Sequence, residues 1–321
     1  MINYTTKHNN QMDYNSQFCN ACANGNLEVA KQLVESYPQI NIYANNNSAF
    51  RHACSRGHLE VTKWLVESYP QINISARDNQ AFRYTCHNGH LEIAKWLVES
   101  YPQINVYALD DYAFQCACSR GHLEVAQWLV GSYPQINISA YDNEAFRNAC
   151  GCGHLEVAKW LVESYPQINV FTYNGAFMSA CANGYLEVAK WLVESYPQIY
   201  ISGLHDYAFR SACQHGHLDI AKWLVESYPQ INISACNDYA FRFACSNGRV
   251  EVPKWLVEIR PYCYVLELDP FQTHILNWRI RSIQETRWLE RAVPVLAYNS
   301  KTPNVFQRLN YDTMRYICEF V

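Results

Sequence analysis

One pattern of residues recurs eight times along the chain, at a spacing of 31 or 32 residues. Its fullest form reads Phe-Arg-x-Ala-Cys-x-x-Gly-His-Leu-Glu-Val-Ala-Lys-Trp-Leu-Val-Glu-Ser-Tyr-Pro-Gln-Ile-Asn-Ile. The first residues of the copies are Phe18, Phe50, Phe82, Phe114, Phe146, Phe177, Phe209 and Phe241. Repetition at this period is typical of stacked supersecondary units, each too small to bury its own apolar face. The sequence therefore predicts a stack of such units with an extended binding surface, and no active site.

The composition limits the classes to which this protein can belong. Of its 321 residues 49% are apolar, which is enough to fold. The formal net charge of −4 argues against nucleic acid as a partner, because nucleic acid is bound by clustered excess Lys and Arg. The polar, Asn-rich N-terminus does not have the pattern of a secretory signal. No apolar run approaches about 18 residues, so we expect no membrane-spanning segment.

Eight of the 14 cysteines occupy one position of the repeat: Cys22, Cys54, Cys86, Cys118, Cys150, Cys181, Cys213 and Cys245. Equivalent atoms of stacked helical units lie about 8–10 Å apart. A disulfide needs Cα atoms within about 7 Å of each other. These cysteines therefore cannot cross-link one another, and we interpret them as small buried side chains of a protein in a reducing, cytoplasmic compartment.

The copy at residues 48–79 illustrates the local structure that the pattern predicts. A short first helix ends at Gly57, which has the role of a left-handed cap. A second helix follows over residues 59–67, with an apolar stripe on one side and Glu and Lys on the other. Pro70 stops this helix. After an extended stretch, Ala76-Arg77-Asp78-Asn79 carries turn-forming side chains before the next Phe.

The run Gly-His-Leu-Glu-Val-Ala-Lys-Trp-Leu-Val-Glu, followed by Ile-Asn-Ile, resembles the ankyrin repeat over residues 15–258. The resemblance implies an all-α solenoid of eight helix–turn–helix repeats joined by loops with a β-turn. It also implies a monomeric, non-catalytic scaffold that binds a protein partner without a cofactor. Ser48-Ala49-Phe50-Arg51 departs from the usual Thr-Pro-Leu-His, and Tyr69-Pro70 replaces the usual Gly after the second helix. Cys after Ala, Trp in the second helix and Asn-rich loops further resemble the ankyrin arrays of large DNA viruses of amoebae, which would place the protein in the host cytoplasm.

The sequence predicts three parts: a polar tail at residues 1–14, eight repeats at 15–258, and a helical appendage at 259–321. The array is expected to end in the eighth copy, where Pro253 replaces Ala and should distort the first turns of the helix. In the sixth copy the loop is shorter, and Gly175 indicates a tighter reversal there.

Two interpretations of the C-terminal appendage remain open. It either caps the last repeat, since the end of a solenoid must be shielded from water, or docks a partner. Residues 304–321 are similar to the F-box-like tails of poxviral ankyrin proteins, although Leu309-Asn310-Tyr311 replaces the usual Leu-Pro opening. This similarity implies an alternative function, in which the protein is a substrate receptor that binds a ubiquitin-ligase adaptor through residues 304–321.

Histidines recur at one position of the repeat: His58, His90, His122, His154 and His217. A shared metal would need ligands within about 2.0–2.1 Å of one ion, which residues at repeat spacing cannot provide. We interpret these histidines as polar groups that bond the turn between helices. No zinc motif, phosphate-binding loop or nucleophile elbow is present, so no metal, cofactor or catalytic residue is predicted.

Tryptophans recur in the second helix: Trp64, Trp96, Trp128, Trp160, Trp191, Trp223 and Trp255. They could form a stacking platform for single-stranded nucleic acid, but the adjacent Glu residues favour packing between repeats. Charged residues flank most copies of the Phe, with Arg immediately after it and Asp three or four residues before it. They form either a charged stripe on the concave face or turn-favouring Asp residues with Arg residues that reach a neighbouring loop.

Positions that change from copy to copy are not dictated by stacking, so they are the candidate contacts of a partner. In ankyrin arrays the loop tips and first helices line a concave groove, and the resemblance implies that variable residues on these elements bind the partner. The candidates are Asn46, His52, Arg77, Gln80, Tyr84, Tyr112, Cys116, Tyr141, Glu144, Asn148, Tyr173, His205, Tyr207, Tyr239 and Phe243. Tyrosine offers a large contact area and a polar end. A Tyr-rich, mildly acidic groove would favour a protein of some basic character.

Overall fold

The computed structural model describes residues 14–171 and 174–259, which belong to two compact units divided between residues 172 and 173. Every regular element in these ranges is a helix, so the predicted all-α stack is confirmed. The first unit contains a helix over residues 14–23, α2 (Leu27–Ser36), α3 (Ala44–Ser55), α4 (Leu59–Ser68), α5 (Ala76–His87), α6 (Leu91–Ser100), α7 (Ala108–Ser119), α8 (Leu123–Ser132), α9 (Ala140–Gly151) and α10 (Leu155–Ser164). The second contains α11 (Gly175–Asn183), α12 (Leu186–Ser195), α13 (Gly203–His215), α14 (Leu218–Ser227), α15 (Ala235–Ser246) and α16 (Glu251–Ile259).

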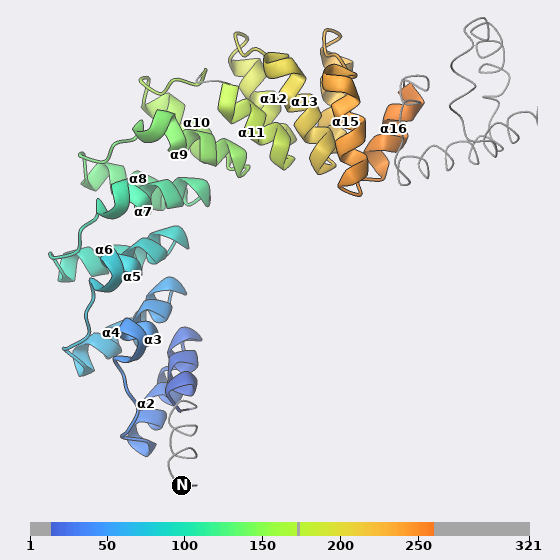
Figure 1. Ribbon diagram of the computed structural model, residues 1–321. Helices are drawn as coiled ribbons and strands as arrows, with labels where there is room; N and C mark the ends of the chain where they lie inside the picture. The colour runs from blue at the N-terminus through green and yellow to red at the C-terminus, as the bar shows by residue number, and fades with distance from the viewer. Residues whose placement is uncertain (1–13, 172–173, 260–321) are drawn as a thin grey trace, which may run out of the picture. The chain divides into compact units, whose positions relative to one another are not determined.

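Within each unit the first helices of successive copies pack side by side (Figure 1). In the first unit α5 lies between α3 and α7, and α7 lies between α5 and α9. In the second unit α13 lies between α11 and α15. Each second helix packs on the first helix of its own copy, as α4 does on α3. Of the predicted tail at residues 1–14, only Tyr14 is described, and it lies in the first helix. Of the predicted appendage at residues 259–321, only Ile259 is described, and it ends α16. Tyr173 lies outside the described residues.

The core of each unit consists of residues that recur in the repeat. The Phe that opens each copy is at most 1% exposed, and the Leu in the middle of the second helix, such as Leu65 and Leu97, is fully buried. The recurring cysteines are free thiols, and each is at most 2% exposed. Burial raises the pKa of the Cys22 and Cys54 thiols to about 12. These observations confirm that this Cys is a small core residue.

The recurring histidines join each copy to the preceding one. His58 Nε2 lies 3.0 Å from the carbonyl oxygen of Ala23, and His90 Nε2 lies 3.1 Å from that of Ser55. His122, His154 and His217 make the corresponding backbone bonds to His87, Ser119 and Ala182. Burial lowers the pKa of His90 and of these three residues, which favours the neutral imidazole. The predicted bond to the turn between helices is confirmed, and its acceptor lies in the preceding copy.

Two constraints, a left-handed backbone and a close neighbouring side chain, favour glycine at the position before the recurring histidine. Gly57 has φ +85°, a left-handed conformation that side chains disfavour, so its predicted role as a helix cap is confirmed. The imidazole of His90, from the next copy, lies directly over its Cα, and a Cβ there would be 2.7 Å from the ring. The Gly-His pair therefore forms a close contact between successive copies, which we call the Gly-His seam.

The predicted turn at Ala76–Asn79 is present, but its handedness was not predicted. Arg77, Asp78 and Asn79 all have left-handed backbone angles, with φ of 54° to 57°. Every described copy with a full-length loop has such a triplet, at residues 45–47, 77–79, 109–111, 141–143, 204–206 and 236–238. A left-handed conformation costs an L-residue about 1–2 kcal/mol, so other contacts must stabilise these turns.

The Arg that follows the Phe in five of the eight copies supplies one of these contacts. Arg83 is 8% exposed, and its Nε and Nη2 donate to the carbonyl oxygens of Asp78 and Arg77 at 2.8 and 3.0 Å. Arg51, Arg210 and Arg242 bond their turns in the same way, and Arg147 makes one such bond. The fourth copy, which has Gln in place of Arg, uses Gln115, whose Nε2 donates to the carbonyl oxygen of Asp110 at 3.0 Å. Arg thus has a structural role, and it bonds the turn that ends the preceding copy, which is the neighbouring loop that the sequence interpretation expected.

The third residue of the turn joins successive loops. Asp111 Oδ2 accepts from the backbone N–H of Asn137 at 3.0 Å, and Asp206 Oδ2 accepts from that of Asn232 at 3.3 Å. Both carboxylate side chains belong to buried residues, so these bonds replace lost hydration. Short polar side chains at this position therefore fix the spacing of the loops.

We expect Arg83→Ala to lower the free energy of unfolding by about 2 kcal/mol, because two bonds from a buried charged group are lost. Arg83→Gln should cost about half as much, since Gln keeps one bond, as Gln115 does. Urea unfolding followed by circular dichroism measures both. Lys95→Ala, which removes an exposed pair with Glu92, is the control and should cost less than about 0.5 kcal/mol. Equal losses for the Ala and Gln variants at position 83 would contradict this role.

Two local expectations need correction. Asn174, just before α11, is left-handed with φ 52°, whereas Gly175 is the first residue of α11. Pro253 lies in the first turn of α16, which begins one residue later in its copy than the other second helices. A proline is tolerated there because first-turn N–H groups have no partner within the helix. Among residues 14–171 and 174–259, no helix has the length and apolar character to cross a membrane.

Candidate functional site

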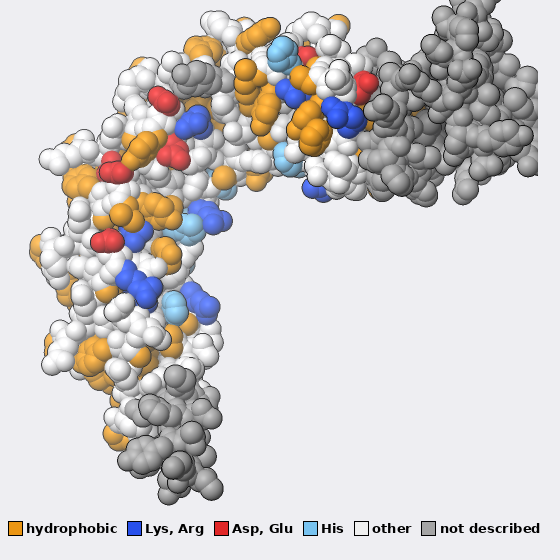
Figure 2. Space-filling model, viewed as in Figure 1, with side chains coloured by type: hydrophobic (Ala, Val, Ile, Leu, Met, Phe, Trp, Pro, Cys, Tyr) orange, Lys and Arg blue, Asp and Glu red, His pale blue; other side chains and the backbone are white. Residues whose placement is uncertain are grey.

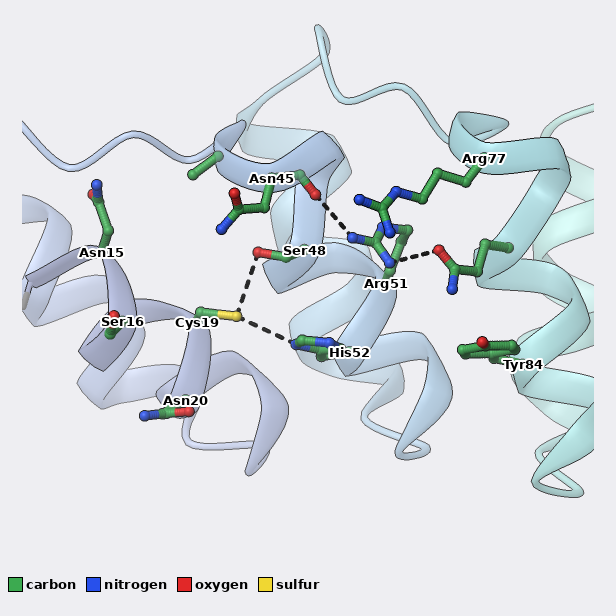
Figure 3. A pocket seen from close by; sticks show the side chains of 12 residues that line it. Asn15, Ser16, Cys19, Asn20, Asn45, Ser48, Arg51, His52, Arg77 and Tyr84 are labelled. Carbon is green, nitrogen blue, oxygen red and sulfur yellow. Dashed lines mark hydrogen bonds between the residues drawn. The ribbon is translucent and has the colours of Figure 1, made fainter. Parts of the chain in front are cut away.

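A polar groove of about 720 Å³ crosses the first helices of the first three copies, at residues 14–23, α3 and α5 (Figure 3). It is lined by Asn15, Ser16, Cys19, Asn20, Ala44, Asn45, Ser48, Arg51, His52, Arg77, Gln80 and Tyr84. Four of these were predicted as partner contacts: His52, Arg77, Gln80 and Tyr84. None of the twelve is Asp or Glu and two are Arg. The expectation of a mildly acidic groove is therefore wrong for this groove.

Arg51 organises the middle of the groove (Figure 3). Besides its bonds to the carbonyl oxygens of Asn45 and Asn46, its Nη1 donates to Gln80 Oε1 of the next copy at 2.7 Å. Burial lowers the pKa of Arg51, but a guanidinium remains charged in proteins. Arg51 thus holds Gln80 in the groove wall and contributes a fixed positive charge.

Cys19 and His52 meet in the groove (Figure 3). Cys19 Sγ lies 3.3 Å from His52 Nδ1 and 3.5 Å from Ser48 Oγ. Burial, and then the charges of Arg51 and Arg56, lower the pKa of His52, which favours the neutral imidazole. Cys19 is not among the contact residues predicted from the sequence. The signal was available, because Cys19 stands where five of the other copies have Arg.

The remaining candidates of the first unit lie outside this groove. Tyr112 is half-buried beneath Arg83, whose guanidinium carbon is 5.1 Å from the ring centre. Tyr141 is 57% exposed, and its hydroxyl donates to Asp110 Oδ2 at 2.5 Å. Cys116 is buried, so it offers a partner little surface. Asn46 is exposed, and Glu144 and Asn148 are half-buried.

In the second unit the aromatic candidates cluster around Arg210. Its guanidinium carbon lies 5.8 Å from the ring centre of Tyr207 and 4.8 Å from that of Tyr239. Tyr239 also stacks on Phe243, with ring centres 3.9 Å apart. Tyr207 and His205 are exposed, whereas Tyr239 and Phe243 are half-buried. These residues form a cation–π cluster that can present aromatic surface to a partner.

The recurring tryptophans pack within their own copies. Each described Trp from Trp64 to Trp223 is half-buried and meets, edge to face, the Tyr at the end of its helix, as Trp96 meets Tyr101 at 5.7 Å between ring centres. Trp64 additionally meets Phe18 of the preceding copy at 6.4 Å. These contacts support a packing role for the recurring tryptophans.

The face in Figure 2 shows basic and histidine side chains gathered over α3, α5 and α7 of the first unit. The arginines of this region are Arg51, Arg56, Arg77, Arg83 and Arg120. Most second helices, by contrast, carry exposed acidic residues such as Glu60 and Glu92. In the described part of the chain, no group of three His, Cys, Asp or Glu residues could hold a metal ion.

Models of the ankyrin repeat match the chain at residues 18–108, 82–174 and 115–203 (three copies) and at 209–257 (many copies). These matches span more than half of the chain, which therefore belongs to the ankyrin-repeat family. No curated protein matches it. It is similar to the human ASB11 ankyrin repeat domain, with 19% identity, a TM-score of 0.43, and coverage of 60% of this chain and 95% of that one. It is also similar to an ankyrin repeat family protein from Legionella pneumophila, with 22% identity and a TM-score of 0.36. That match covers 80% of this chain and 72% of the other.

Ankyrin repeats generally mediate protein–protein interactions, and proteins of this family are typically non-enzymatic scaffolds. Repeat proteins of this kind bind along the extended surface that their stacked units create. The residues that serve stacking and those that serve binding can therefore be separated by comparing copies.

Proposed function

We propose that this protein is a non-catalytic scaffold that binds a protein partner on the first helices and loop tips of its repeats. The groove over residues 15–84 carries this proposal. Its lining includes Cys19, His52, Gln80 and Tyr84, at positions where the copies differ. The core of the stack is made by residues that recur. The four variable side chains line the groove, where Cys19, His52 and Gln80 also bond a neighbouring copy and Tyr84 is 38% exposed.

The charge of the groove favours an acidic segment as its occupant. Arg51 is fixed in the wall and Arg77 is exposed at the rim, while no carboxylate lines the groove. Arg56, which follows the C-terminus of α3, and Arg83 in α5 extend the positive field. Tyr84, 38% exposed, offers an aromatic surface of the kind that anchors peptides. The partner that fits is a protein with an exposed acidic stretch.

Panning a random peptide library against the full chain should enrich peptides of net negative charge. The affinity of the best peptide, measured by fluorescence anisotropy, should fall about tenfold in Arg77→Glu, a change of about 1.4 kcal/mol. The substitution replaces an attractive charge at the rim with a repulsive one. The loss should be smaller in high salt, because exposed charges are screened.

Lys95→Glu is the matched control, since it makes the same charge change on α6, outside the lining of the groove. It should leave the affinity unchanged. Enrichment of basic peptides, or equal losses for the two variants, would refute an acidic occupant.

The receptor function remains an alternative proposal. Its docking residues, 304–321, lie outside the described ranges. We also propose that the protein is a monomer in a reducing cytoplasm, which would be the host cytoplasm if its source is viral. The free, buried thiols of the repeat support a reducing compartment.

A further inference from the structure

We infer that Cys19 is a modification site, at which the protein forms a mixed disulfide with a small anionic disulfide such as oxidised glutathione. The reaction needs no bound protein partner, so it is independent of the function proposed above. Three observations support it: the position of Cys19 in the repeat, its contact with His52, and the charge of the groove that it lines.

The position of Cys19 is not explained by stacking. The recurring cysteines are core residues, whereas Cys19 stands where other copies carry the turn-binding Arg, and it is half-buried at the groove. Its partner His52 also lies at a position that varies, occupied by Tyr84 in the next copy. Stacking therefore dictates neither residue of the pair.

The contact with His52 supplies a base. The thiolate is the nucleophilic form of cysteine. With Cys19 Sγ 3.3 Å from His52 Nδ1, the thiol can donate its proton to the neutral imidazole. Two exposed cysteines, Cys152 and Cys236, make no hydrogen bond to histidine in the described part of the chain. The structure thus distinguishes Cys19 from thiols that are merely accessible.

The groove supplies room and charge for the second reactant. Its volume of about 720 Å³ is within the range of small-molecule sites. Arg51 and Arg77 face a space without carboxylates, which favours a disulfide that carries carboxylates of its own. A cationic disulfide such as cystamine meets the opposite field.

The reaction is a thiol–disulfide exchange that balances without a further reactant. The Cys19 thiolate attacks one sulfur of oxidised glutathione, a new S–S bond forms, and the original S–S bond breaks. Cys19 is oxidised to the mixed disulfide, and the released glutathione is reduced to its thiol. The proton that His52 took from Cys19 passes to the released thiolate.

The test incubates the folded full-length protein with oxidised glutathione and follows each cysteine by peptide mass spectrometry. Cys19 should be modified about tenfold faster than Cys152 and Cys236, although those two are more exposed. With cystamine in place of glutathione disulfide, the advantage of Cys19 should largely disappear. Modification of Cys19 no faster than that of Cys236, or equal preference for both disulfides, would overturn the inference.

Two variants then distinguish the contribution of His52 as a base from that of the positive charge of the groove. His52→Ala should slow modification of Cys19 about fivefold with either disulfide, whereas His205→Ala, an exposed histidine of the second unit, should not. Arg77→Glu should reduce the preference of Cys19 for glutathione disulfide over cystamine about tenfold, with Lys95→Glu as its control. An unchanged rate in His52→Ala would remove the histidine from the mechanism, and the inference would fail with it.

Discussion

Phe114→Ala is expected to lower the free energy of unfolding by about 3–5 kcal/mol, the largest effect predicted for a single substitution in this protein. Phe114 is fully buried in α7, which packs between α5 and α9. Truncation removes apolar contact and leaves a cavity that neighbouring helices, fixed by their own seams, can fill only in part. Because each copy is stabilised by its neighbours, we expect the loss to extend to α5 and α9.

Urea unfolding followed by tryptophan fluorescence measures this effect, and hydrogen exchange shows which helices lose protection. Phe171→Ala is the matched control, because Phe171 is 42% exposed. It should cost less than about 1 kcal/mol. If the two substitutions cost the same, the recurring Phe is not the centre of the core.

Gly57→Ala is expected to lower the free energy of unfolding by about 2–3 kcal/mol, from two sources. A left-handed alanine costs about 1–2 kcal/mol. The new Cβ also displaces the imidazole of His90, whose bond to Ser55 is worth about 1 kcal/mol. The same urea titration measures the loss.

Two other glycines separate these sources. Gly248 has φ +67°, but a Cβ on it would have no described atom within 4 Å, so Gly248→Ala should show the backbone cost alone, about 1–2 kcal/mol. Gly131 lies within α8, where a Cβ would also meet no described atom within 4 Å, so Gly131→Ala should stabilise the protein by about 0.5–1 kcal/mol. In a His90→Ala background, Gly57→Ala should cost less than in the wild type. An identical cost in both backgrounds would mean that the Gly-His seam does not couple the two residues.

The sequence predicted those parts of the fold that local chemistry determines. Apolar residues at helical spacing, Gly57 at the end of one helix and Pro70 after the next gave the order of elements and the position of the turns. The histidines were predicted to bond the turn, because residues at repeat spacing cannot converge on one metal. Repetition supports these predictions, because the same residues occupy the same positions in successive copies.

The handedness of the turns could not be predicted from the sequence. Three successive left-handed residues without glycine are locally unfavourable, so nothing in Arg77-Asp78-Asn79 indicates them. They are stabilised by Arg83 of the next copy, whose reach back to this turn depends on the packed position of α5. The sequence interpretation allowed for an Arg that reaches a neighbouring loop, but not for the left-handed backbone that it stabilises there.

For the site, comparison of the copies identified four groove residues but misjudged the charge of the groove. The acidic residues of the chain were counted together, whereas the fold places many of them on the second helices, away from this groove. Cys19 was overlooked because its significance lies in a contact with His52, 33 residues away in the next copy.

The division between units falls beside the sixth copy, which has a shorter loop and Tyr185 in place of the recurring His.

The cysteines of the core can form incorrect disulfides when the chain is unfolded. In the native protein these thiols are buried and do not meet oxidants. Denaturation exposes one such thiol in every repeat, and each can then react. Flexible chains can then pair sulfurs that the native spacing keeps apart, and such incorrect bridges would trap molecules before they refold. The fraction of protein that refolds after heating or after urea denaturation should therefore be larger when a reductant is present.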